Sequence, residues 1–306
     1  MGTQYVVKIV DFPQGDSAVR LRRAVDERLA ELEGLLSNYD PDSDVSRFND
    51  TKDGQWMNLS GEIAEVAGES ARIGELTGGA FDVTCSPLVS LWGFGPGRRA
   101  LTRAPTDEQI AEAMAAAGVD RIEYRLDPPA LRKTSPEVRI DLSGVAKGYA
   151  VDQIALMLRS AGIASFLVDI GGEVRAQGVN PEGQPWRIGI EVPLPGVRSI
   201  HRVVNLADTA LATSGDYRNY FVQEGKRRSH IIDPRTGRPI EHRLTSVSVM
   251  HPSCARADAL ATGLMVLGPD DGYRLALEQK LAVLMIVDTD SGFDERMTPE
   301  FSAACP

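Results

Sequence analysis

Near the carboxyl end of the chain, the segment ADALATG carries a carboxylate and a hydroxyl one helical turn apart. Asp258 and Thr262 are separated by four residues, so on a helix they share one face. Their hard oxygen atoms suit Mg²⁺, which takes few protein ligands and completes its shell with water and substrate phosphate. The spacing is therefore compatible with a magnesium site. It is also typical of an acidic side chain that only balances the dipole of the first helical turn.

The segment DLSGVAKGYAVD places a cation at the start of a second expected helix. We expect a strand over 138–142, a turn at Ser143 and Gly144, and a helix over 145–161. Lys147 then lies in the first helical turn, where the helix dipole favours an anion over a cation. A phosphate held between Lys147 and the free backbone N–H groups would remove this mismatch. A solvated surface lysine is the alternative.

A third candidate is the histidine in the turn-rich segment RSHIIDPRTGRP. The Asp-Pro-Arg-Thr-Gly run in this segment consists of ordinary turn formers. His230 precedes two isoleucines and is one of only four histidines in the chain, so it is a candidate general base or hydrogen-bond donor. A purely structural histidine would explain the same pattern.

Aromatic side chains occur in several of the polar or glycine-rich turns. Such side chains usually pack in the core, but several of them on loops can also form a slot that stacks on a planar ring system. The residues concerned are Tyr39, Phe81, Trp92, Phe94, Tyr217 and Tyr220.

The charge balance of the chain narrows its possible partners. Of 306 residues, 33 are Lys or Arg and 43 are Asp or Glu, so the net charge is −10. A pI near 5.0 argues against nucleic acid or an anionic lipid surface as the main partner, because both attract clustered basic side chains. The apolar fraction of 42% and the charged fraction of 25% are those of a globular protein. A phosphate ligand would therefore need a locally positive site.

The sequence lacks the signatures of several common enzyme classes. It has no GxxxxGK[ST], GxSxG, HExxH or CxxC motif. The glycine-rich stretch at 93–97 has the wrong spacing for a dinucleotide fingerprint and is interpreted as a loop. Cys85, Cys254 and Cys305 form neither a metal-ligand spacing nor a disulfide framework, and no run of 18 apolar residues predicts a membrane span.

Helices are intermixed with runs of strands along the chain. Besides the helix at 145–161, apolar spacing predicts helices at 17–36, 61–76, 106–118 and 255–267. Strand patterns occur at 5–11, 165–178, 186–192, 202–206, 245–250 and 281–289, and the composition of 37–50 predicts a loop. Because helices and strands do not strictly alternate, the pattern favours an α+β fold with mixed or antiparallel sheets over a doubly wound parallel sheet.

Taken together, these segments resemble the ApbE family of flavin transferases. The resemblance covers nearly the whole chain in at least eight ordered blocks, so it is far more specific than any single motif. It implies one domain over 1–306 with packed helices, a T-fold-like architecture and two interleaved subdomains. The blocks are MGTQYVV, SNYDPDSDVSRFN, TGGAFDVTCSPLVSLWGFGP, IDLSGVAKGYAVDQ, LVDIGGEVRAQG, ALATSGDYRNYF, SHIIDPRTGRP, ADALATGLMVLGP and the GF at 292–293.

The resemblance assigns roles to individual residues of this chain. Mg²⁺ would be held by Asp258 and Thr262, by the backbone carbonyl of Gly144 and at the position of Ala261. Some relatives carry a second Asp where this chain has Ala261, so one carboxylate ligand is absent here. FAD would be bound by Met1, Tyr39, Ala80, Phe81, Asp82, Asp141, Lys147 and Ile231, and the residues around His230 would close the site.

The implied reaction transfers FMN from FAD to a threonine or serine of an acceptor protein and releases AMP. Phosphoryl transfer depends mainly on charge neutralisation and positioning. The expected catalytic residues are Asp258, Lys147 and His230, with His230 accepting the proton of the incoming hydroxyl. Two alternatives stay open: a Mg²⁺-dependent FAD pyrophosphatase that produces FMN and AMP, and a flavin-binding protein without turnover. Some relatives with pyrophosphatase activity have Asn at the position aligned with Tyr39, so Tyr39 favours transfer.

A partner and a compartment are also implied by the resemblance. The acceptor would carry a Ser/Thr-Gly-Ala-Thr-type motif, as in subunits of sodium-pumping quinone reductases, related redox complexes or nitrous oxide respiration components. Most relatives are exported and many are lipid-anchored, so we expect a periplasmic protein whose full-length precursor is anchored to the inner membrane. Met1 belongs to a block that normally follows a leader, and no lipobox cysteine is present, so we expect the leader to have been removed.

Overall fold

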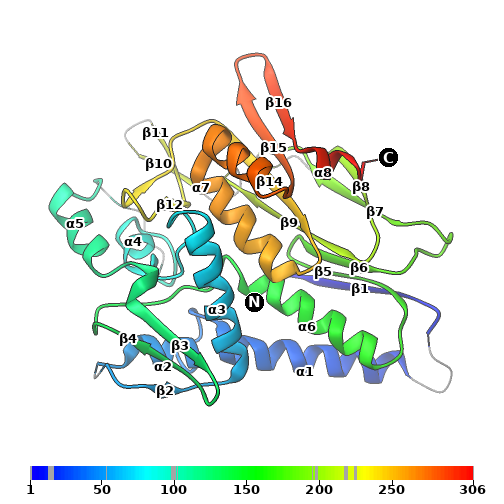
Figure 1. Ribbon diagram of the computed structural model, residues 1–306, viewed down its shortest axis with the longest axis horizontal. Helices are drawn as coiled ribbons and strands as arrows, with labels where there is room; N and C mark the ends of the chain where they lie inside the picture. Colours follow the sequence, from blue (N-terminus) through cyan, green and yellow to red (C-terminus); the bar gives the residue numbers. More distant parts are fainter. Residues whose placement is uncertain are drawn as a thin grey trace.

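The structure is a computed structural model whose helices and strands form a layered α+β molecule (Figure 1). It describes residues 2–12, 17–52, 54–97, 101, 103–194, 196, 199–216, 220–223 and 226–305. The helices are α1 (Ala18–Leu36), α2 (Asp44–Asp50), α3 (Gly61–Leu76), α4 (Ser86–Leu91), α5 (Asp107–Ala115), α6 (Ala146–Ser160), α7 (Cys254–Glu278) and α8 (Pro299–Ser302). None of these helices combines the length and the apolar character needed to cross a bilayer.

A seven-stranded antiparallel sheet forms the middle layer, in the order β1-β5-β6-β9-β14-β15-β16. The turn between β5 and β6 is the pair Gly171 and Gly172, with φ of 68° and 104°. A two-residue hairpin of this kind needs positive φ, which glycine adopts without strain. The strands are β1 (Tyr5–Val10), β5 (Ser165–Ile170), β6 (Glu173–Gln177), β9 (Thr209–Gly215), β14 (Leu244–His251), β15 (Ala282–Thr289) and β16 (Gly292–Met297).

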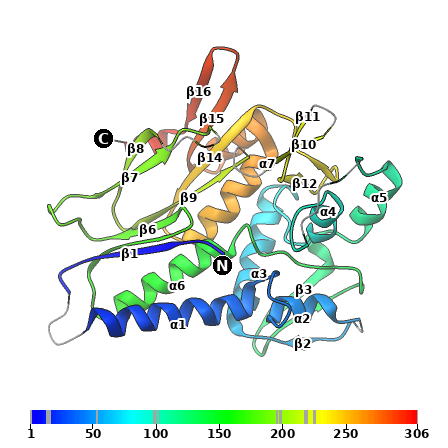
Figure 2. The ribbon, with the colours of Figure 1, turned by 180° about the vertical axis from the view of Figure 1, so that it is seen from behind.

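Helices cover one face of this sheet and a two-stranded ribbon covers the other (Figure 2). α6 packs on β5 and β6, α7 packs on β9 and β14, and α1 lies against α6. On the opposite face, the ribbon of β7 (Trp186–Glu191) and β8 (Ile200–Leu206) buries Trp186, Ile190, Val204 and Leu206 against the sheet, with Phe301 of α8. The sheet therefore has an apolar core on both faces.

A second group of elements lies beyond α7 and surrounds the ends of α3. It contains a three-stranded sheet in the order β2-β4-β3, made of β2 (Met57–Asn58), β4 (Pro129–Lys133) and β3 (Ile122–Leu126). Two short hairpins complete it: β10 (Tyr220–Gln223) with β11 (Lys226–Ser229), and β12 (Ile232–Asp233) with β13 (Arg238–Pro239). The buried side chains of its three-stranded sheet join those of α6, α7 and the large sheet in one core, whereas Ile232 of β12 packs in a separate small cluster with Leu88, Trp92, Phe94 and Ile110.

The predicted α+β class is confirmed, and most predicted elements lie where the apolar periodicity placed them. The helix expected at 255–267 is the first part of α7, which breaks at Gly268 (φ 83°, ψ −178°) and Pro269 and then continues to Glu278. Pro269 cannot donate a backbone hydrogen bond, so the break coincides with the predicted end.

Two local predictions were wrong. Residues 44–50 were expected to be a loop, but Ser43 caps the helix α2 and the helix buries Val45 and Phe48. Residues 138–142 were expected to be a strand, but this segment joins no sheet. Instead the side chain of Asn49 accepts from the Ile140 N–H at 2.7 Å and donates to the Ile140 carbonyl at 2.9 Å. A distant side chain thus satisfies the backbone groups that a neighbouring strand was expected to bind.

The first turn of α6 lies directly against the first turn of α7, and Gly148 makes this approach possible. A Cβ atom at Gly148 would lie 2.3 Å from the carbonyl oxygen of Cys254, which is backbone and cannot rotate away. Asp152, one turn further along α6, accepts from the backbone N–H groups of Cys254 and Ala255 at 3.0 and 3.1 Å. The two helices are therefore held together by backbone contact and by a shared cap.

We expect Gly148→Ala to destabilise the protein by about 3 kcal/mol or more, because the added methyl group overpacks a backbone contact. Gly34→Ala is the matched control, since Gly34 lies inside α1 and its added Cβ would meet nothing within 4 Å. The control should be as stable as the wild type or up to about 1 kcal/mol more stable. Urea denaturation measures both changes, and an unaltered midpoint for Gly148→Ala would contradict the described contact.

Candidate functional site

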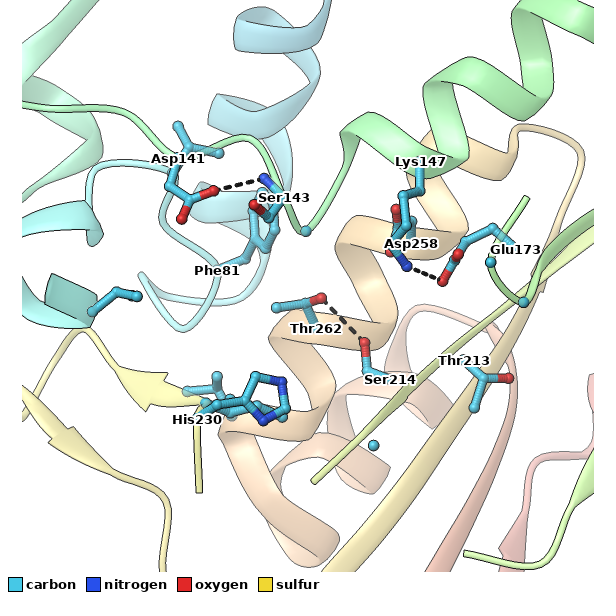
Figure 3. Close-up of a pocket in the computed structure, with 18 of the residues that line it drawn as sticks. Phe81, Asp141, Ser143, Lys147, Glu173, Thr213, Ser214, His230, Asp258 and Thr262 are labelled. Atoms are coloured by element: carbon cyan, nitrogen blue, oxygen red, sulfur yellow. Dashed lines mark hydrogen bonds and ion pairs between the residues drawn. The ribbon is translucent and has the colours of Figure 1, made fainter. Parts of the chain in front are cut away.

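A cavity of about 800 Å³ lies between the helix layer, the large sheet and the second group of elements. Its wall is assembled from segments that are far apart in the chain, as Figure 3 shows for the labelled residues. It includes most of the residues predicted for the site: Tyr39, Ala80, Phe81, Asp82, Asp141, Gly144, Lys147, His230, Ile231, Asp258 and Thr262.

Oxygen atoms of α7, β9 and the loop before α6 meet at the centre of this cavity. Asp258 and Thr262 lie one turn apart on α7, and Thr262 Oγ1 is 3.1 Å from Ser214 Oγ of β9. Gly144 lies beside them, because a Cβ there would be 3.3 Å from Thr262 Oγ1. Asp258 is only 4% exposed, and its Oδ2 accepts from the Gly148 N–H at 3.0 Å. The expected common face of Asp258 and Thr262 therefore points into the cavity.

Lys147 lies between two carboxylates at one end of the cavity (Figure 3). Its Nζ is 2.6 Å from Oε1 of Glu173, a residue that is 2% exposed. Burial raises the pKa of Glu173 to about 8, and the charge of Asp258 adds to the rise while Lys147 opposes it. Burial also raises the pKa of Asp258, and the positive charge of Lys147 again opposes the rise. Burial by itself would lower the pKa of Lys147, but Asp258 and Glu173 keep it above its ordinary value.

These contacts differ from both explanations that the sequence left open for Lys147, a phosphate ligand and a solvated surface side chain. A phosphate was expected between this side chain and the free N–H groups of α6. In the structure, carboxylates do this instead: Glu173 pairs with the lysine, and Asp258 binds the N–H of Gly148 in the first turn of the helix. An anion therefore already lies at the helix start, as the dipole favours. Lys147 faces the cavity with 35% of its side chain exposed, so it can still contact a bound phosphate.

The loop after α3 forms the wall opposite Lys147. Gly263 of α7 lets this loop approach, because a Cβ there would lie 2.8 Å from Thr77 and 3.1 Å from Phe81. Asp82 accepts from both the N–H and the hydroxyl of Thr84, at 2.7 and 2.6 Å. Burial raises the pKa of Asp82, and these hydrogen bonds oppose the rise. Its carboxylate therefore shapes the loop as well as lining the cavity.

Asp141 and Ser143 form a tight turn on the same side of the cavity. Asp141 accepts from the Ser143 N–H at 2.9 Å, and its own N–H donates to the carbonyl of Val83 at 2.6 Å. This turn orients the segment that ends at Gly144 and begins α6. These two hydrogen bonds of Asp141 therefore fix the position of the Gly144 carbonyl, the candidate metal ligand.

His230 extends into the cavity from the loop before β12 and faces Thr262 in Figure 3. Its ring packs edge-on against Phe94, with 6.3 Å between the ring centroids. Phe81, Phe94 and the 65% exposed Tyr39 also line the cavity. Trp92 does not, because it is buried and its Nε1 donates to the Gly237 carbonyl at 2.8 Å. Among the predicted aromatic residues, Trp92 is therefore a core residue.

The predictions for four further residues need separate mention. Met1 and Tyr217 lie outside the described residues, as does the side chain of Tyr220. Ala261 is fully buried and does not line the cavity, so its predicted role as a metal ligand finds no support in this structure. Its side chain has no oxygen, and a carbonyl inside a helix accepts the N–H four residues later.

The remaining donors fit a magnesium ion. The described residues contain no group of three or more His, Cys, Asp or Glu side chains that could hold a metal. Mg²⁺ does not require one, because it is typically bound by one or two carboxylates together with water and substrate phosphate. Asp258, the Thr262 hydroxyl and the Gly144 carbonyl supply hard oxygen atoms at one place, and Ser214 adds another. The raised pKa of Asp258 also indicates that a cation beside it would be stabilising.

Glu173 and Ser214 were not predicted from the sequence. Glu173 directly follows Gly171 and Gly172, and an acidic residue in that position is typical of a surface turn, so the sequence pattern did not indicate a buried side chain. One signal was available: Glu173 begins a strand that is mostly buried, and a buried carboxyl group needs a polar or charged partner. Ser214 had no signal, because only the pairing of β9 with its neighbours directs its hydroxyl towards α7.

A sequence profile described as the ApbE family matches residues 1–285. The chain belongs to the ApbE family. The resemblance predicted from the sequence is thereby confirmed over nearly the whole chain.

Relatives with names and structures agree with this assignment. A Vibrio cholerae protein named FAD:protein FMN transferase is 45% identical over 301 residues, which cover 98% of this chain and 89% of the relative. An Escherichia coli K12 protein of the same name is 39% identical over a match that covers 99% of this chain and 86% of the relative. The solved structure of flavin transferase ApbE from V. cholerae superimposes with a TM-score of 0.91 at 42% identity, covering 99% and 96%. The structure of apo flavinyl transferase ApbE from Pseudomonas stutzeri superimposes with a TM-score of 0.90 at 39% identity. The match covers 100% of this chain and 94% of that structure.

The buried carboxyl group of Glu173 predicts a pH dependence of stability in this ApbE-family protein. Its folded pKa of about 8 exceeds the ordinary value of 4.5, so between these values the folded state holds a proton that the unfolded state has lost. This group therefore lowers the free energy of unfolding as the pH rises through that window, by at most about 1.4 kcal/mol per pH unit.

Glu173→Gln should reduce this slope, because an amide does not titrate. Urea denaturation at pH 5, 6.5 and 8 measures it, and the exposed Glu182→Gln serves as the control that keeps the wild-type slope. Equal slopes for wild type and Glu173→Gln would show that Glu173 does not titrate in this range.

Proposed function

We propose that this protein transfers FMN from FAD to a hydroxyl group of an acceptor protein and releases AMP. The observation that carries the proposal is the set of hard oxygen donors beside Lys147 in one cavity, in a chain whose family relatives are named FAD:protein FMN transferase. In the proposed step, the acceptor oxygen forms a bond to the FMN-side phosphorus. The bond from that phosphorus to the bridging oxygen breaks, and AMP leaves with the electron pair.

The residues around Asp258 would bind and orient the pyrophosphate. Lys147 would contact its oxygen atoms and offset their charge as it shifts from one phosphoryl group to the other. Asp258, Thr262 and the Gly144 carbonyl would hold Mg²⁺, which when bound neutralises pyrophosphate charge. Phe81 and Tyr39 border the same cavity and provide aromatic surface for the flavin or adenine ring.

His230 would take the proton of the incoming hydroxyl. It lines the same cavity as Thr262 and Lys147, so an acceptor hydroxyl placed between its ring and the pyrophosphate would meet both (Figure 3). The edge-on contact with Phe94 restricts the ring to one side of the cavity. A base in this position favours attack by a hydroxyl that is delivered from outside the cavity.

Hydrolysis of FAD is the second candidate, because water can use the same site as an acceptor hydroxyl. Tyr39 favours transfer over hydrolysis: it is 65% exposed at the cavity, where it can cover the bound flavin. The proposed acceptor carries a Ser/Thr-Gly-Ala-Thr-type motif and belongs to a quinone reductase or to a related redox or nitrous oxide respiration complex. We also propose that the protein works in the periplasm.

Incubation with FAD, Mg²⁺ and an acceptor domain that carries such a motif tests the proposal. Intact-mass analysis of the acceptor and chromatography of the nucleotides give the result. Covalently bound FMN with an equal amount of AMP supports transfer. Free FMN and AMP without an adduct would support hydrolysis, and unchanged FAD would leave only a binding function.

We expect Asp258→Asn to reduce transfer at least about 100-fold, because it removes the carboxylate at the centre of the oxygen cluster. Flavinylation rates at increasing Mg²⁺ concentration measure this effect. Asp271→Asn is the matched control, since Asp271 is an exposed acidic residue of the same helix outside the cavity. A wild-type rate in Asp258→Asn would exclude Asp258 from the metal site.

His230→Gln should slow transfer by roughly 100-fold or more and leave FAD binding unchanged, because it removes a proton acceptor without removing a phosphate contact. Quenching of flavin fluorescence measures the binding, and the pH dependence of the rate measures the titrating group. If the variant keeps both the rate and its pH profile, then His230 is a structural residue.

A further inference from the structure

In the part of the chain that the structure describes, β6 ends beside the cavity before its neighbour β9 does. β14 pairs with β9 from Ala210 to Gly215, but β6 pairs with β9 only from Thr209 to Leu211. Beyond Leu211, no strand of the described part of the chain lies on the β6 side of β9. Within the described residues, the edge of β9 from Thr213 to Gly215 therefore has no strand partner on this side.

This gap opens into the cavity, and we call it the β9 notch. Its sides are Leu211 and residues 213–215 of β9, the turn at Gly171 and Gly172 with Glu173, and residues 188–191 of β7. Four consecutive residues of β7 line the cavity. Neighbouring side chains of a strand point in opposite directions, so a strand that contributes consecutive residues presents its edge. The notch is thus bordered by the edges of two strands.

The chemistry of the β9 notch suits a peptide better than a phosphate. Of the described residues that line the cavity, only Lys147 and His230 are basic, and neither belongs to the strands that border the notch. Ile188, Ile190 and Leu211 give it apolar walls instead. An anionic pyrophosphate therefore belongs beside α7, whereas the notch offers backbone hydrogen bonds and apolar contacts.

A strand added in the notch would direct its side chains in a defined way. Ser214 points to the helix face of the sheet, where its hydroxyl meets Thr262. Thr213, its neighbour, points to the other face of the sheet, where its hydroxyl lies 2.8 Å from that of Ser248 of β14. Residues that oppose each other in an antiparallel pair have their side chains on the same face. The residue opposite Ser214 would therefore extend towards Thr262 and Asp258, while its neighbours would extend towards β7 or solvent.

We propose that the acceptor protein binds in the β9 notch as an added antiparallel strand, with its target threonine or serine opposite Ser214. This rests on the proposed transferase function and names the surface that its protein substrate uses. The extended segment continues the line of β6 and pairs with the free edge of β9. The same contact that binds the acceptor thus orients its hydroxyl towards the pyrophosphate.

Hydrogen exchange measured by mass spectrometry tests the proposal on the wild-type protein. The probe is the acceptor domain with its target threonine changed to alanine, added in the presence of FAD and Mg²⁺. We expect the acceptor to slow exchange in peptides that cover residues 209–216 beyond the level that FAD and Mg²⁺ alone produce, because Ser214 itself lies among the candidate metal donors. Equal exchange of these peptides with and without the acceptor would overturn the proposal.

Thr213→Trp provides a second test, because the indole would fill the notch on the β7 side. We expect the KM for the acceptor domain to rise about 10-fold or more, which corresponds to the loss of two or so backbone hydrogen bonds. FAD affinity, measured by fluorescence quenching, should stay unchanged and shows that the variant is folded. Val19→Trp is the control: it places the same indole on an exposed residue of α1 outside the cavity, and it should retain the wild-type KM.

The two hypotheses fail in different ways. If the wild-type protein attaches no FMN to any acceptor, the transferase function is wrong. If it does attach FMN and Thr213→Trp has an unchanged KM for the acceptor, or loses acceptor and FAD binding to the same extent, only the assignment of the notch is wrong.

Discussion

The contact between the first turns of α6 and α7 is the constraint on which the site depends. Gly148 allows the two backbones to meet, and its N–H donates to Asp258 at 3.0 Å. Asp152 then caps α7 from α6. Because Lys147 lies on α6 and Asp258 and Thr262 lie on α7, this single junction determines where the cation and the oxygen donors stand relative to each other. A shift of either helix would separate them.

The junction also explains how an acidic protein can bind an anionic substrate. The net charge is −10, and most ionisable side chains that line the cavity are carboxylates. Asp258 and Glu173 hold the pKa of Lys147 above its ordinary value, and Lys147 in turn opposes the rise that burial causes in the pKa of Glu173 and of Asp258. In the proposed function, a pyrophosphate would therefore be bound by one fixed cationic side chain, Lys147, and not by an extended basic surface.

The two faces of the large sheet border the cavity with different kinds of side chain. Charged and hydroxyl groups gather on its helix face, where α6 and α7 meet β6 and β9. The ribbon of β7 and β8 lies on the opposite face and contributes apolar side chains and a strand edge. The cavity connects the two faces where β6 ends before β9 does. A small phosphorylated substrate and a polypeptide can thus approach the same centre from different sides.

The sequence by itself determined the α+β class, most of the helices and the pairing of Asp258 with Thr262, because these follow from apolar periodicity and from spacing along one chain segment. It did not determine the α2 helix, the irregular segment at 138–142, or the partners of Lys147. Asn49 bonds Ile140 from 91 residues away, and Glu173 reaches Lys147 of α6 from strand β6. Such contacts depend on which distant segments pack together, and local propensity carries no information about that. Only the tertiary structure could therefore decide that carboxylates occupy the start of α6 and that the sheet is left open beside the site.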